Sequence, residues 1–135
     1  MFTLSNEMLM LIINVLCVAF FTVLLIQSGV DKLLDWEGNL SWLTGHFKDS
    51  LFSNMVPLLL GIITVTELGA GLVCAYGVVE LLVFGENTFA RIGIILSAVN
   101  LLMLFVGQRI AKEYAGAAVL ALYFLLSIVS LFFLI

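Results

Sequence analysis

Four long apolar stretches restrict what this chain can fold into more than any other feature of the sequence. They run over residues 8–27, 56–79, 92–106 and 115–135. A helix needs about 20 residues to cross the hydrocarbon core of a bilayer. Because lipid offers no hydrogen-bond partners to backbone groups, each stretch has to be helical. The sequence therefore predicts an all-α membrane protein, a four-transmembrane-helix antiparallel bundle that forms a single domain over residues 1–135.

The composition agrees with this fold class. The chain is 64% hydrophobic and only 10% charged, whereas soluble domains are typically about half apolar and a quarter charged. We therefore expect membrane lipid to surround much of the chain. The net charge of −4 argues against nucleic acid as a partner, because binding it needs clustered lysine and arginine.

The connection between the first two stretches, residues 28–54, is too long for a simple turn. Its large apolar side chains recur at steps of three and four residues: Leu33, Trp36, Leu40, Leu43, Phe47 and Leu51. Polar residues fall between them, which is the pattern of an amphipathic helix at a membrane surface. We expect an amphipathic interfacial segment between helices 1 and 2, broken into pieces at Gly38 and Gly45.

Basic residues near the helix ends predict the orientation in the membrane. One side holds the long connection and the turn before the fourth stretch, with Lys32, Lys48, Arg109 and Lys112. The other side holds only Arg91. Because basic residues favour the cytoplasmic side, both termini are expected outside.

Glu67 is the most informative residue, since it lies near the midpoint of the second stretch. A carboxylate there costs about 2.5–3.5 kcal/mol even on lenient scales, so we expect it to face the bundle interior. Thr64, Gly71 and Cys74 share its helix face. Asn100, near the middle of the third stretch, is its expected hydrogen-bond partner. Glu67 is then either a proton-handling or ligand-binding acid, or a structural carboxyl bonded to a neighbouring helix.

Two further groups of residues are candidates for packing or binding. Gly61, Gly69 and Gly71 allow helices to approach closely, which supplies much of the packing energy in lipid. A polar cluster is expected where the first helix ends near the turn before the fourth, and its members are Gln27, Ser28, Asp31, Lys32, Gln108, Arg109, Lys112 and Tyr114. This cluster is either a site for an anion, a quinone headgroup or a partner, or a set of boundary charges that pair with one another and with lipid phosphates.

Histidine and cysteine residues give little support for a metal or haem site. His46 is the only histidine, so a histidine-based metal site or a haem with two histidine ligands is excluded. Cys17 and Cys74 lie inside apolar stretches and lack zinc-binding spacing. We therefore expect no bound metal.

Three short motifs resemble the DoxX family of small four-helix bacterial membrane proteins. They are QSGVDKL at residues 27–33, ELGAGL at 67–72 and GQR at 107–109. The resemblance covers nearly the whole chain, including the helix count and the long first connection. It implies a location in the bacterial inner membrane, so the outside position that the basic residues predict for both termini is the periplasm.

The resemblance also implies a function. Namesakes of the DoxX family are implicated in sulfur-linked quinone reduction as subunits of thiosulfate:quinone oxidoreductase, so the best expectation is a redox-linked membrane component associated with a quinone. The chain has no soluble thiosulfate-binding domain and no evident cofactor ligands, which makes it a subunit rather than an enzyme on its own. The alternatives are a non-catalytic accessory subunit of a larger complex and a small-molecule or ion carrier. A membrane protein partner or a homo-oligomer is expected in each case.

Overall fold

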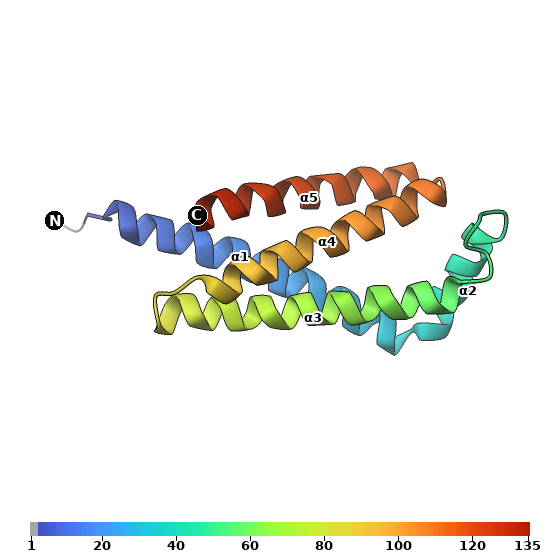
Figure 1. Cartoon of the computed structure of the whole chain (residues 1–135), viewed down its shortest axis with the longest axis horizontal. Coiled ribbons are helices and arrows are strands. Elements are labelled where there is room, and N and C mark those ends of the chain that lie inside the picture. Colours follow the sequence, from blue (N-terminus) through green and yellow to red (C-terminus); the bar gives the residue numbers. More distant parts are fainter. Residues whose placement is uncertain (1–2) are drawn as a thin grey trace.

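A computed structural model describes residues 3–135 as five helices (Figure 1). They are α1 (Asn6–Leu34), α2 (Trp36–Phe47), α3 (Val56–Val83), α4 (Thr88–Ile110) and α5 (Tyr114–Leu134). All except α2 are long and apolar enough to cross a membrane. The predicted four-helix bundle with a helical segment between its first two spans is confirmed, and the chain is a multi-pass integral membrane protein in contact with lipid.

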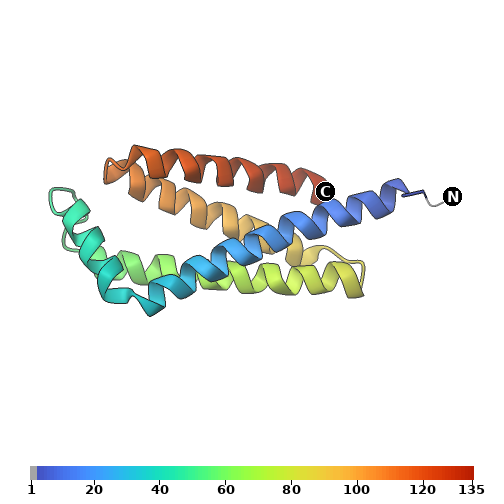
Figure 2. The same ribbon diagram turned by 180° about the vertical axis from the view of Figure 1, so that it is seen from behind.

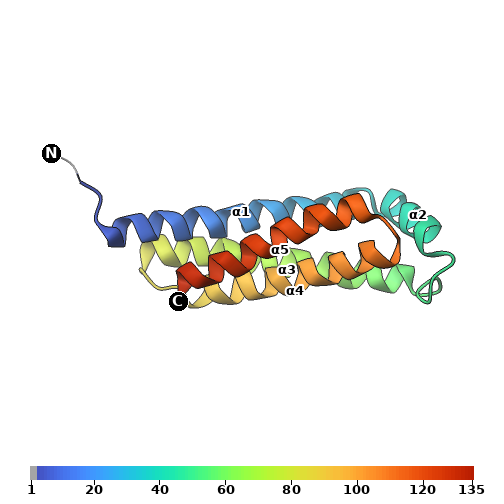
Figure 3. The same cartoon turned by 90° about the horizontal axis from the view of Figure 1, so that it is seen from above.

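The spanning helices pack in chain order. α1 packs mainly on α3, α3 on α4, and α4 on α5, while α1 and α5 touch only weakly. The start of α1, the end of α5 and the α3–α4 turn lie at one end of the bundle, and α2 and the α4–α5 turn lie at the other (Figures 2 and 3). The short α3–α4 and α4–α5 turns force these neighbouring helices to run antiparallel, whereas α1 and α3 are joined through α2.

The helices extend beyond the apolar stretches that predicted them. The first continues from the expected residue 27 to Leu34, and the third spans Thr88–Ile110 rather than 92–106. Polar residues such as Lys32 and Gln108 are good helix formers, so they end the apolar pattern without ending the helix. At 23 residues, α4 is therefore long enough to span the bilayer by itself.

The expected breaks in the surface segment are in the wrong place. Gly38 and Gly45 both lie inside α2. The chain bends instead at Asp35, where φ is −125° and ψ is 52°, outside the helical region. Gly38 lies directly against the Asp35 carboxylate, so the small residue makes room for the bend rather than causing a break itself. Phe47, 6% exposed, anchors the far end of α2 in the bundle.

Of the three glycines expected to allow close helix approach, Gly71 alone lies in such a contact, and Gly93 was not expected. Gly71 does lie in a contact, because an added Cβ would be 3.1 Å from the backbone nitrogen of Ile26 in α1. Gly69 has no neighbour within 4 Å, and Gly61 has only the Trp36 ring at 4.0 Å. At Gly93 of α4, an added Cβ would lie 2.9 Å from the backbone nitrogen of Cys74. The α3–α4 contact therefore needs a glycine at position 93.

Gly93→Ala should destabilise the bundle, because the new methyl group meets α3 backbone that cannot move aside. We expect the free energy of unfolding to fall by about 1–3 kcal/mol, the usual effect of overpacking. Gly69→Ala is the matched control, since alanine is favoured over glycine by about 1 kcal/mol in a helix and this position is open. Melting temperatures in detergent measure both, and equal values for the two variants would contradict this packing.

Candidate functional site: a buried ion pair beside an apolar cavity

Glu67 pairs with a lysine at the centre of the bundle. Its side chain is fully buried, and Oε1 lies 2.7 Å from Nζ of Lys32, whose side chain is 17% exposed. Lys32 Nζ also donates a hydrogen bond of 2.9 Å to Ser28 Oγ, one turn earlier on α1. A charge-assisted contact of this kind is among the stronger polar interactions in proteins. The ion pair offsets the free-energy cost of burying a carboxylate in the middle of a membrane-spanning helix.

The stagger between α1 and α3 brings the two charges to the same depth. α1 ends at Leu34, short of the first turns of α3, so Lys32 lies beside Glu67 within the bundle rather than at the boundary where the sequence placed it. Gly29 permits this approach, because an added Cβ would lie 2.7 Å from Leu68 Cγ. Ser28 and Lys32 are four residues apart and therefore share the helix face toward α3.

The pair leaves hydrogen-bonding capacity unused. An ammonium group has three donors, and Lys32 uses two of them within residues 3–135, on Glu67 and Ser28. Glu67 Oε2 is buried and has no hydrogen-bond partner in the same part of the chain. One donor of Lys32 and one acceptor of Glu67 are thus left for a ligand, a proton or water.

Asn100 is not the partner of Glu67, so this expectation was wrong. Asn100 is fully buried, and its Nδ2 donates to Thr66 Oγ1 at 2.8 Å and toward the carbonyl of Ile63 at 3.5 Å. Thr66 and Glu67 are adjacent in sequence, which turns their side chains about 100° apart on a helix. The Thr66 side of α3 meets α4, and the Glu67 side meets α1.

An apolar cavity of about 550 Å³ adjoins the ion pair. It lies beside the first turns of α3, which α1 does not reach and which the shorter α2 only partly covers. Its walls come mainly from α2, α3 and α4, with Lys32 reaching in from α1, and its other polar residues are Asn39, Trp42 and Gln108. The volume lies within the range of about 300–1,000 Å³ that is typical of small-molecule sites.

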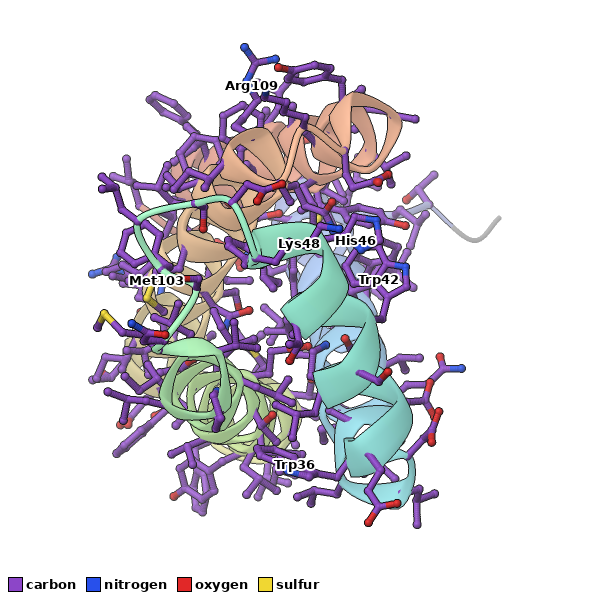
Figure 4. All side chains as sticks on the ribbon, turned by 90° about the vertical axis from the view of Figure 1, so that its right-hand side faces the viewer. Trp36, Trp42, His46, Lys48, Met103 and Arg109 are labelled. Carbon is purple, nitrogen blue, oxygen red and sulfur yellow. The ribbon has the colours of Figure 1, made fainter. Side chains whose placement is uncertain are left out.

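Figure 4 looks onto this end of the molecule. Met103 of α4 lines the cavity and lies across from α2, while Trp42 and His46 lie side by side on α2. Phe47 and Phe52 add aromatic surface to the walls. The cavity can therefore hold an apolar molecule whose polar end reaches Lys32.

The expected polar cluster does not form one site. Ser28, Lys32 and Gln108 are at the ion pair or the cavity, whereas Gln27 and Asp31 are exposed on α1. The other three members form a separate group at the α4–α5 turn: Arg109, Lys112 and Tyr114. There the Arg109 guanidinium lies 4.6 Å from the centre of the Tyr114 ring, and Lys112 has a φ of 61°.

Sequence reasoning missed a second buried acid and assigned Arg91 a different role. Glu80 is 3% exposed and accepts a hydrogen bond of 2.9 Å from the backbone N–H of Phe89, in the first turn of α4. A carboxylate there satisfies an unpaired helix N–H and favours the helix dipole. Arg91 Nε donates to the carbonyl of Leu134 at 2.8 Å, so it binds the last turn of α5. The position of Glu80 in the last turn of α3, one short turn before α4, was the available signal.

Comparisons with known proteins found no matching family model, no matching curated protein and no matching solved structure. Within residues 3–135 no group of three histidine, cysteine, aspartate or glutamate side chains is placed to hold a metal ion. The ion pair and the cavity are therefore the features on which a functional proposal can stand.

Lys32→Met should cost much more stability than replacing both partners. Removing one member of a buried pair typically costs about 3–5 kcal/mol, because the other charge is left unpaired, whereas replacing both with apolar residues is often neutral. We expect Lys32→Met to unfold at lower denaturant in detergent, and the double variant Lys32→Met/Glu67→Leu to regain most of the loss. Strictly additive effects of Lys32→Met and Glu67→Leu would contradict a direct pair.

Proposed function

We propose that the chain is a DoxX-like component of a quinone-linked redox system in a bacterial inner membrane, and that its cavity binds the quinone. The observation that carries this proposal is the position of Lys32. Its ammonium group lines the apolar cavity and is fixed from behind by Glu67 and Ser28. A carbonyl oxygen in the cavity can therefore accept a hydrogen bond from the remaining N–H of Lys32.

The charge of the site favours a neutral ligand over an anion. Lys32 and Glu67 together carry no net charge, so a carboxylate or phosphate entering the cavity would have to compete with Glu67 for Lys32. A neutral carbonyl group accepts a hydrogen bond without disturbing the pair. The aliphatic and aromatic walls suit an isoprenoid or alkyl tail, since such pockets bind mainly by apolar burial with a few polar groups setting orientation.

Glu67 is proposed to hold and exchange a proton beside the ligand. A quinone supplies the redox chemistry, because it takes up two electrons and two protons to become a quinol. Lys32 orients the headgroup, and the buried Glu67 Oε2, which has no hydrogen-bond partner within residues 3–135, can accept a proton and return it through Lys32. The electrons would come from another subunit, in line with the resemblance to quinone oxidoreductase components.

The basic residues still favour the same orientation in the membrane, although the difference between the two ends of the bundle is smaller. Lys48, Arg109 and Lys112 lie at the end of the bundle that carries α2, and Arg91 lies at the other end. Lys32 no longer counts, because it pairs inside the bundle. The remaining difference still favours a cytoplasmic α2 end and periplasmic termini.

Two other functions remain: an accessory subunit without its own ligand, and a carrier of a small molecule or ion. The cavity favours a ligand-binding role over a purely structural one. Purification from native membranes separates these functions, because quinone that co-purifies with the chain supports the proposal, and a fixed protein partner without quinone supports the accessory role.

Decylubiquinone should quench the fluorescence of Trp42, which lines the cavity, in a saturable titration of the purified protein. Because a hydrogen bond to a charged group is worth about 1.5–3 kcal/mol, we expect Lys32→Met/Glu67→Leu to weaken binding by roughly tenfold or more. Lys48→Met is the control, since Lys48 is exposed and does not line the cavity. Decanoate should bind the parent protein more weakly than decylubiquinone.

Equal quenching of all three proteins would refute the cavity as the quinone site. Glu67→Gln then separates binding from proton exchange, because an amide keeps an acceptor for Lys32 but cannot take up a proton at neutral pH. We expect this variant to bind decylubiquinone and to lose quinone reduction in native membranes. Full quinone reduction in Glu67→Gln would leave Glu67 a structural role only.

A further inference from the structure

Few polar contacts fasten α2 over the cavity. It provides four of the lining residues: Asn39, Trp42, Leu43 and Phe47. At its start it follows the bend at Asp35, and near its end His46 contacts Glu113, just before α5, with Nε2 2.8 Å from Oε1. This contact alone among the ion pairs of residues 3–135 joins α2 to the α4–α5 turn.

The geometry around His46 favours the protonated ring. Nδ1 lies 2.8 Å from the backbone carbonyl oxygen of Trp42, while Nε2 lies against the Glu113 carboxylate. Carbonyl and carboxylate oxygens only accept hydrogen bonds, so both ring nitrogens have to donate. Neutral imidazole has one N–H, and only the protonated imidazolium has two.

The surroundings of His46 are compatible with a positive charge. The Trp42 ring stacks on the imidazole at 3.8 Å between ring centres, an arrangement in which an aromatic face attracts a cation. Glu113 is the charged group that faces His46 from the α4–α5 turn, with Lys112 beside it in sequence. From the end of α2 itself, Lys48 lies next to His46 (Figure 4). Arg109 lies over Tyr114, at the outer side of the α4–α5 pair.

We propose that His46 and Glu113 form a pH-sensitive latch that holds α2 closed over the cavity. With His46 protonated and Glu113 ionised, both hydrogen bonds form and α2 is fastened to the α4–α5 turn. When His46 loses a proton, one ring nitrogen presents a lone pair to an oxygen, and one of the two contacts is lost together with the charge that attracts Glu113. Histidine changes charge between about pH 5 and 8, so the latch is strongest at the acidic end of that range and weakens as the pH rises.

Tryptophan fluorescence reports the latch directly. In the Trp36→Phe background Trp42 is the one tryptophan left, and a stacked imidazolium quenches indole emission. We expect emission to rise with pH in a single-proton titration between about pH 5 and 8. His46→Gln should remove this titration, because glutamine stays neutral throughout, and the same titration in His46→Gln would overturn the proposal.

Hydrogen exchange measures whether the latch moves α2. Partly exposed ion pairs are worth up to about 1 kcal/mol, so after correction for intrinsic rates the α2 amides should exchange roughly two- to fivefold faster at pH 8 than at pH 5.5. Glu113→Gln is the matched control, since its amide can accept from or donate to the ring in either state. It should make α2 protection independent of pH. If exchange of the α2 amides in the parent protein does not depend on pH, the proposal is also overturned, whatever the cavity binds.

Discussion

The ion pair between Lys32 and Glu67 is the interaction on which the rest of the site depends. A carboxylate in the middle of a membrane-spanning helix needs a partner, because neither lipid nor bulk water can solvate it there. The partner is Lys32, in the last turn of α1, and α1 ends short of the first turns of α3. Gly29 makes the approach possible by letting Leu68 pack against the backbone of α1.

The cavity is a consequence of the same arrangement. Where α1 stops, the remaining part of α3 would face lipid alone, and the chain turns at Asp35 to place α2 beside it. A helix of 12 residues joined by a bend covers that surface incompletely, which leaves the hollow next to Lys32. The point at which α1 ends therefore sets the position of the ion pair and of the cavity with its α2 wall.

Much of the fold could be predicted from the sequence, because apolar stretches of membrane-spanning length have few alternatives in lipid. The interior position of Glu67 followed from the same reasoning. The partner of Glu67 did not, since the choice between Lys32 and Asn100 depends on where α1 ends and on how α3 is rotated against α1 and α4. Likewise, the spacing of Gly69 and Gly71 cannot tell which glycine faces a neighbour, and the contact of His46 with Glu113 joins residues far apart in the chain.

The charge state of Glu67 tests the central claim most directly. Infrared difference spectra between the parent protein and Glu67→Gln, recorded in lipid at neutral pH, isolate the vibrations of this one side chain. If Lys32 and Glu67 form an ion pair, the difference spectrum contains the stretching bands of an ionised carboxylate, and Lys32→Met replaces them with the carbonyl band of a protonated acid. A protonated Glu67 in the parent protein, unchanged by Lys32→Met, would contradict the account.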